Sequence, residues 1–77
     1  MTNSRKTLTH AIQRYVRSYP GRQTEGYVFI EARIQDKFGA GPKSLPENLI
    51  EQAIELVEEY FQRIMRLQAI KRKNILT

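Results

Sequence analysis

The chain contains no cysteine among its 77 residues. This absence excludes disulfide bonds, zinc–thiolate sites, iron–sulfur clusters and cysteine nucleophiles. Stability must therefore come from the packing of secondary structure or from a partner subunit. A chain of this length buries only about 60% of the surface that its unfolded state exposes, so we expect the monomer to be modestly stable. We expect a single helical domain over residues 1–77, in a reducing, cytoplasmic setting.

Histidine and long hydrophobic runs are equally scarce. His10 is the only histidine, so a histidine-based metal site would need several copies of the chain to share it. No apolar run approaches the roughly 18 residues of a membrane span, and the N-terminus is polar, unlike a signal peptide. No nucleophile stands in a recognisable pattern with an adjacent base. We therefore expect no enzyme activity, no cofactor, no metal site and no membrane association.

Apolar residues at helical spacing predict a first helix over about residues 7–18. They recur at i, i+3, i+4 and i+7, which places them on one helix face. These residues are Leu8, Ala11, Ile12, Tyr15, Val16 and Tyr19. Pro20 and Gly21 follow and are expected to end the helix. Residues 1–6 are polar and are expected to form a flexible N-terminus.

Residues 27–38 fit two structures. As a helix, the segment places Tyr27, Ile30, Ile34 and Phe38 on one face, with Gly39 following as a C-terminal cap. As a strand, it alternates polar and apolar residues and begins with residues that favour strands. A strand needs a partner, and the chain has no second convincing strand, although a ribbon shared between two chains would supply one. We favour the helix.

Ser44 and Glu47 have the spacing of a capping box, which predicts the start of a long third helix. It is expected to run to about Lys73, with residues 74–77 flexible, giving a length of about 40 Å. Its apolar residues cover about half of the circumference, which is wider than the usual stripe of about 100°. They are Leu49, Ile50, Ala53, Ile54, Leu56, Val57, Tyr60, Phe61, Ile64, Met65 and Leu67. Burial is expected to end near Ile70.

The fold class predicted by these patterns is all-α: a small three-helix domain with a long amphipathic C-terminal helix, as a dimer. Two short helices would cover part of the wide apolar face, and a second copy would cover the rest. The charge pattern supports this hypothesis. Residues 44–60 contain five acidic and no basic residues, whereas residues 61–77 contain five basic and no acidic residues. An antiparallel partner helix would pair the two segments, although acid first and base last also complements the helix dipole.

A basic face opposite the apolar stripe of the first helix suggests nucleic-acid binding. This face carries Lys6, His10, Gln13, Arg14 and Arg17. Cationic side chains of this kind contact phosphates without reading sequence, although they also simply solvate a surface. The residues predicted to bind nucleic acid are Lys6, Arg14, Arg17, Arg22, Lys71, Arg72 and Lys73. The favoured function is therefore a small non-enzymatic nucleic-acid-binding regulator or accessory protein.

An alternative function is a protein-binding adaptor or inhibitor that does not bind nucleic acid. Val28 and Phe29 fall off the apolar stripe of residues 27–38 and would form a second apolar patch. The residues predicted at a protein interface are Val28, Phe29, Leu56, Tyr60 and Leu67. A helix-turn-helix DNA reader is not expected. The gap Tyr19–Gly26 is longer than the motif's turn of about 3–4 residues, and the third helix begins with acidic residues.

Overall fold

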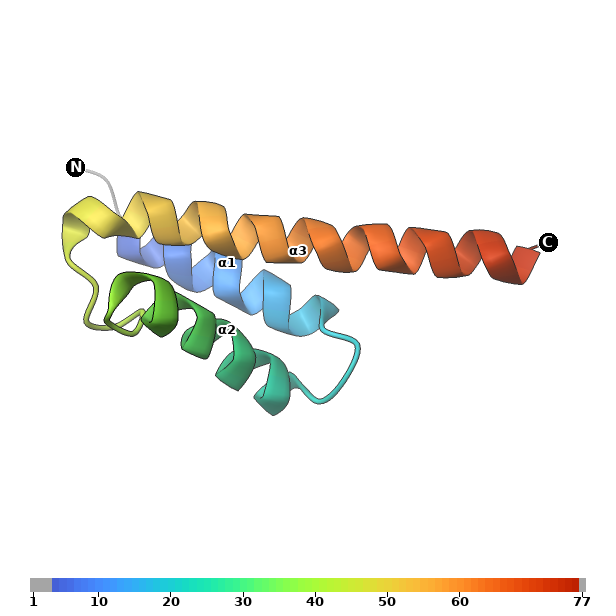
Figure 1. Ribbon diagram of the computed structural model, residues 1–77, viewed down its shortest axis with the longest axis horizontal. Coiled ribbons are helices and arrows are strands. Elements are labelled where there is room, and N and C mark those ends of the chain that lie inside the picture. Colours follow the sequence, from blue (N-terminus) through green and yellow to red (C-terminus); the bar gives the residue numbers. More distant parts are fainter. Residues whose placement is uncertain (1–3, 77) are drawn as a thin grey trace.

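The computed structural model describes the backbone of residues 4–76 and the side chains of residues 4–70. Its elements are α1 (Ser4–Ser18), α2 (Gln23–Phe38) and α3 (Glu47–Leu76). All three are helices, and the described residues contain no strand, which confirms the all-α prediction and settles residues 27–38 as helical. α1 and α3 lie side by side and run in the same direction, and α2 runs in the opposite direction below them (Figure 1). The molecule measures 47 × 24 × 17 Å, with α3 along its longest axis.

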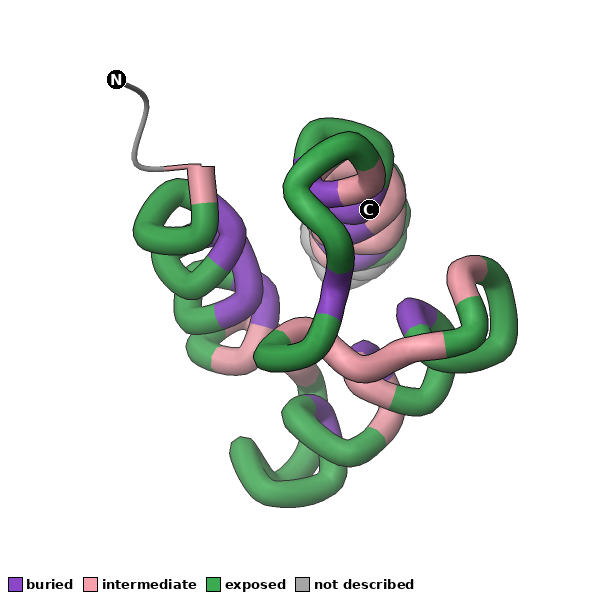
Figure 2. The backbone as a smooth tube through the Cα atoms, turned by 90° about the vertical axis from the view of Figure 1, so that its left-hand side faces the viewer, coloured by how far each residue is buried: buried purple, intermediate pink, exposed green. Residues whose placement is uncertain are grey.

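The core lies where the three helices meet, and α1 and α3 share the most extensive contact. Buried positions turn toward this common interior (Figure 2). The largest fully buried side chains are Leu8, Ile30, Ile34, Leu45, Ile50 and Val57. The predicted apolar face of α1 is confirmed, since Leu8, Ala11, Ile12 and Tyr15 are all buried. Tyr27, expected on the buried face of α2, is instead exposed, and Gly26 is buried beside it.

α2 begins at Gln23, four residues before the predicted start, so its connection to α1 is only Tyr19–Arg22. The predicted gap Tyr19–Gly26 is therefore wrong, and the observed connection is no longer than the turn of a helix-turn-helix motif. The apolar pattern missed the first turn because it is polar and ends in Gly26. That glycine lets α2 approach the connection closely: a Cβ at Gly26 would lie 2.7 Å from Cγ of Tyr19. At the other end, Gly39 adopts a left-handed φ of 76° and caps the helix, as predicted.

The predicted capping box does not form. α3 begins at Glu47, whereas Ser44 lies in a turn in which its N–H donates to the carbonyl of Gly41 at 3.0 Å. The reason is Pro46, which disfavours helical geometry at the residue before it. Leu45 therefore stays outside the helix and its side chain is fully buried in the core. The guanidinium of Arg5 fixes this segment further by donating to the carbonyl of Leu45 at 2.6 Å.

α3 continues to Leu76, three residues past its predicted end, but its burial ends sooner than expected. Ile64 is the last buried residue among those described, and Met65 is half-buried. Leu67 is 59% exposed and Ile70 is 56% exposed. The expectation that burial reaches Ile70 is therefore wrong, because α1 and α2 both end before this part of α3 (Figure 1). The C-terminal part of α3 projects with an apolar edge uncovered.

We expect Gly26→Ala to lower the free energy of unfolding by up to about 2 kcal/mol. Displacing Tyr19 costs about 1–3 kcal/mol as overpacking, which exceeds the gain of about 1 kcal/mol from replacing a helical glycine. Gly41→Ala is the matched control, since a Cβ there meets nothing within 4 Å. Urea unfolding of both variants measures the difference. Equal stability of the two variants would show that a methyl group at position 26 fits beside the Tyr19 side chain, which would contradict the close contact.

Burial in the core raises the pKa of the Tyr15 hydroxyl. The side chain is 2% exposed, and burial, with smaller effects from Tyr19 and Tyr60, raises the pKa of Tyr15 from 10.0 to about 12. The folded state therefore holds this proton more tightly than the unfolded state. Its stabilising contribution is complete below pH 10 and is lost as the pH rises toward 12.

Tyr15→Phe should therefore lose less stability than the natural chain between pH 8 and pH 11. Urea unfolding at the two pH values tests this, because the other tyrosines titrate in both proteins and cancel in the comparison. An identical loss in both proteins would mean that the Tyr15 hydroxyl is as accessible to solvent as in the unfolded chain.

Candidate nucleic-acid interface

The outward face of α1 carries basic side chains and no acidic one. Lys6, His10, Gln13 and Arg17 are all exposed, and their spacing places them in one stripe along the helix, about 17 Å long. α1 contains no acidic residue. Within the described residues, neither Lys6 nor Arg17 has an ion-pair partner. The stripe therefore presents uncompensated positive charge and hydrogen-bond donors to solvent.

Arg14 lies at the edge of this stripe and is already engaged. Its guanidinium forms an ion pair with the Glu58 carboxylate of α3 and stacks over the Phe61 ring, 4.6 Å from the ring centroid. The side chain remains 52% exposed, so the pair is worth little to stability, about 0–1 kcal/mol. The small pocket beside it, about 210 Å³, also contains Glu58 and is therefore unsuited to an anion. The sequence did not indicate that Arg14 would be partly neutralised.

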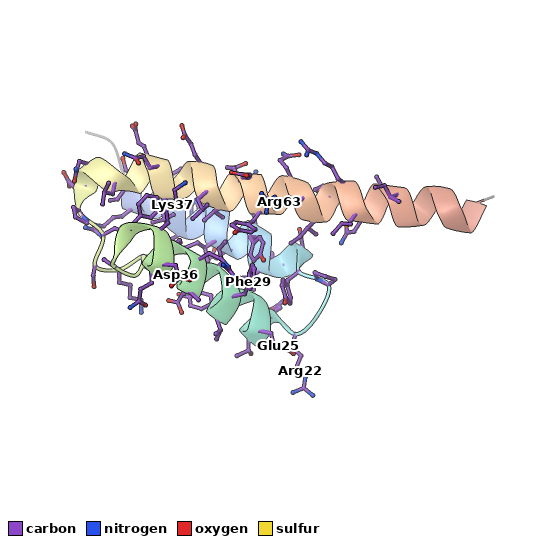
Figure 3. All side chains as sticks on the ribbon, in the orientation of Figure 1. Arg22, Glu25, Phe29, Asp36, Lys37 and Arg63 are labelled. Atoms are coloured by element: carbon purple, nitrogen blue, oxygen red, sulfur yellow. The ribbon has the colours of Figure 1, made fainter. Side chains whose placement is uncertain are left out.

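Arg22 follows the end of α1, and the C-terminal basic cluster belongs to α3. Arg22 is exposed in the connection between α1 and α2 and points away from α3 (Figure 3). The side chains of Lys71, Arg72 and Lys73 lie outside the described residues, although their backbone is part of α3. One contact relates this segment to α1: the side-chain amide of Gln68 donates to the Ser18 carbonyl at 3.3 Å. The C-terminal end of α1, with Arg17, therefore lies one helical turn before Lys71 on α3.

The acidic residues of α3 lie mostly away from α1. The ladder consists of Glu47, Glu51, Glu55 and Glu59, all of them exposed. On a helix with 100° per residue, these four positions point away from the buried face. Glu58 is the acidic residue of α3 that contacts α1, through Arg14. The acidic ladder and the basic stripe therefore form two separate surfaces.

The residues predicted at a protein interface form a mixed surface between α2 and α3. Val28 is 60% exposed and lines an open pocket of about 500 Å³ together with Phe29 and Tyr19. Phe29 is half-buried and packs edge-to-face on Tyr60, with ring centroids 5.7 Å apart. Leu56 and Tyr60 are half-buried, and Leu67 is exposed. The prediction thus combined side chains that pack within the chain with side chains that face solvent.

Two arginines, one on α2 and one on α3, lie on this aromatic pair. The guanidinium of Arg33 lies 5.0 Å from the Phe29 ring centroid, and that of Arg63 lies 5.0 Å from the Tyr60 ring centroid. Phe29 and Arg63 face each other across the space between α2 and α3 (Figure 3). Arg63 also donates to Glu59 at 2.9 Å, one turn earlier in α3. The i, i+3 and i, i+4 spacings in α3 could have indicated both of these neighbours of Arg63.

Other kinds of site find no support in the described residues. No three histidine, aspartate or glutamate side chains gather there in a way that could hold a metal ion. In the same part of the chain, no helix has both the length and the apolar character needed to cross a membrane. Comparisons with protein-family models, with curated proteins and with solved structures give no match to this chain. The function is therefore inferred from the charges and contacts on the surface of the chain.

Proposed function

We propose that the protein is a small non-enzymatic nucleic-acid-binding protein, a regulator or accessory factor, that contacts phosphates through the outward face of α1. The observation that carries this proposal is the exposed stripe of Lys6, His10, Gln13 and Arg17 on a helix without any acidic residue. Uncompensated cations bind nucleic acid because each neutralised phosphate releases condensed counterions. Glu58 reduces the contribution of Arg14, so Lys6 and Arg17 are the main contacts.

The composition of the stripe favours binding with little sequence preference. Cationic side chains position a protein on phosphates and carry no sequence information directly. Gln13 is the one side-chain amide in the stripe, and an amide could pair with a base edge. Arg22 and the Lys71–Lys73 segment would extend the contact from the Arg17 end of α1. The expected ligand is therefore a phosphate backbone, with at most a local contribution from base contacts.

The proposed binding form is a homodimer formed through α3. Two copies related by a two-fold axis present two basic stripes, so the second contact with a long nucleic acid becomes intramolecular. This multiplies affinity without any new kind of contact. The proposed site of action is the cytoplasm, which suits a chain without cysteine.

The pocket beside Val28 favours a second candidate function, that of a protein-binding adaptor or inhibitor. Its lining is mainly apolar, from Tyr19, Val28, Phe29 and Ala32. An apolar surface of this kind binds a protein with little dependence on salt, in contrast to phosphate contacts. Salt dependence therefore distinguishes the two functions.

We expect Arg17→Glu to weaken binding of duplex DNA, single-stranded DNA or RNA by at least about eightfold at 0.1 M salt. Each phosphate contact contributes about 0.9 to the slope of the logarithm of the association constant against the logarithm of the salt concentration. Losing one contact therefore lowers the association constant about eightfold at 0.1 M salt and makes this slope shallower by about 0.9. The matched control is Lys37→Glu, which makes the same change in charge in the last turn of α2. Fluorescence anisotropy across a salt series measures both quantities.

Equal weakening by the two variants would indicate a general effect of net charge and would contradict a specific α1 face. Absence of binding tighter than about 100 μM at low salt by the natural chain would move the assignment to the adaptor function, since non-specific nucleic-acid binding usually reaches that strength.

Glu58→Gln should strengthen nucleic-acid binding. The substitution removes the carboxylate that pairs with Arg14, so the guanidinium becomes available for a further phosphate. The expected gain is up to about eightfold in affinity at 0.1 M salt, with a steeper salt slope. Glu55→Gln is the control, because it makes the same change in net charge at an exposed position of α3. A gain of the same size in both variants would mean that Arg14 does not reach the nucleic acid.

A further inference from the structure

One edge of α3 is only partly covered by α1 and α2. It is defined by residues at alternating spacings of four and three, the spacing of a coiled-coil seam. We call it the open edge of α3: Leu56, Tyr60, Arg63, Leu67 and Ile70. Leu56 and Tyr60 are half-buried, whereas Leu67 and Ile70 are more than half exposed. The coverage of this edge therefore decreases toward the C-terminus of α3.

The reason lies in the lengths of the helices. The contact between the Gln68 side chain and the Ser18 carbonyl joins α3 to the very end of α1. The backbone of α3 remains helical to Leu76, about 12 Å farther along the axis. This projecting segment extends past α1 and α2 in Figure 1. Where this segment begins, a single copy of the chain leaves Leu67 and Ile70 more than half exposed.

Charges beside the open edge define which partner it fits. Glu59 and Arg66 lie seven residues apart, so they flank the edge on the same side. Both are exposed, and Arg66 has no ion pair within the described residues. One flank of the edge thus carries an acid in its first half and a base in its second half. When a second α3 runs in the opposite direction, the acidic half of this flank therefore lies beside the basic half of the partner's flank.

We infer that the open edge binds the same edge of a second copy, with the two α3 helices antiparallel and the two-fold axis passing between Phe61 and Gln62. This register places Leu67 opposite the partner's half-buried Leu56. It also places Tyr60 opposite the partner's Arg63, an aromatic–guanidinium pairing that each chain already makes internally. Arg66 lies next to the partner's Glu59. The projecting segment of each copy is thereby covered by the half-covered N-terminal part of the other.

A parallel arrangement is disfavoured by the same charges. In a parallel pair the flanks that carry Glu59 and Arg66 lie on opposite sides of the seam, so neither side chain meets the oppositely charged side chain of the partner's flank. Reversing one helix brings the two flanks to the same side and Arg66 next to the partner's Glu59. The antiparallel arrangement also aligns the helix dipoles favourably. This inference rests on the dimer of the proposed function and is independent of nucleic-acid binding.

Cysteine cross-linking tests the register directly, because the natural chain has no cysteine. An oxidised mixture of Leu56→Cys and Leu67→Cys chains should give a disulfide-linked heterodimer. Leu67→Cys alone should not link to itself, since the two positions would be about 16 Å apart along the axis, beyond the roughly 7 Å limit between Cα atoms. Glu51→Cys, exposed on the opposite side of α3, is the control that should not cross-link.

The outcomes separate the inference from the proposed function. Self-linking of Leu67→Cys would keep the dimer and overturn the antiparallel register. Absence of cross-links together with a monomeric mass would overturn the dimer and assign the open edge to a different protein. Anisotropy with labelled DNA and RNA on the same samples tests the α1 face separately, so unimpaired binding by a monomer would leave that part of the function standing.

A charge exchange provides a second test. Glu59→Arg or Arg66→Glu alone should raise the dimer dissociation constant about tenfold in analytical ultracentrifugation, and the double variant should restore it. Circular dichroism controls for helix loss, because Glu59→Arg also removes the pair with Arg63. A double variant as weak as the two single variants would contradict the antiparallel pairing.

Discussion

The length of α3 is the constraint on which the rest of the structure depends. α3 has 30 residues, whereas α1 and α2, the helices that cover it, have 15 and 16. The N-terminal half of α3 completes the core through Ile50, Ala53 and Val57. The C-terminal half extends beyond both covering helices and keeps Leu67 and Ile70 exposed. Apolar surface left in water favours association, so this mismatch in length connects the fold of one chain to the proposed dimer.

The charged residues also differ between the N-terminal and C-terminal halves of α3. The net charge of +5 is composed of a basic α1, an acidic first half of α3 and a basic end of α3. Among the residues whose side chains the structure describes, few of these charges meet: Arg14 pairs with Glu58, and Arg63 pairs with Glu59. Most of the acidic ladder and the α1 stripe face solvent on separate surfaces. The proposed phosphate contacts use the α1 stripe, and the proposed dimer uses the open edge of α3, beside which Glu59 of the ladder lies.

The sequence was sufficient for the parts of the fold that depend on periodicity. Apolar spacing predicted α1 and most of α3, and Gly39 marked the end of α2. It failed where tertiary contacts decide, as at the start of α2, which is polar and depends on Gly26 lying against Tyr19. It also failed at Ser44, because the effect of Pro46 on the preceding residue outweighed the capping box.

The candidate site was predictable only as a helix face. The exposure of the α1 stripe follows from its position opposite the apolar residues. The pairing of Arg14 with Glu58 could not be predicted from the sequence. It depends on the relative rotation of α1 and α3, which no local pattern encodes.

Amide hydrogen exchange of residues 67–76 at increasing protein concentration tests the central claim, that a second copy covers the projecting segment of α3. An uncovered helix end opens with little free energy and exchanges fast, whereas a packed helix opens only when the dimer dissociates. If the dimer forms, protection of residues 67–76 from exchange rises with protein concentration, while protection of the core residues around Ile50 stays nearly constant. Fast exchange of residues 67–76 at every concentration up to the millimolar range would contradict it.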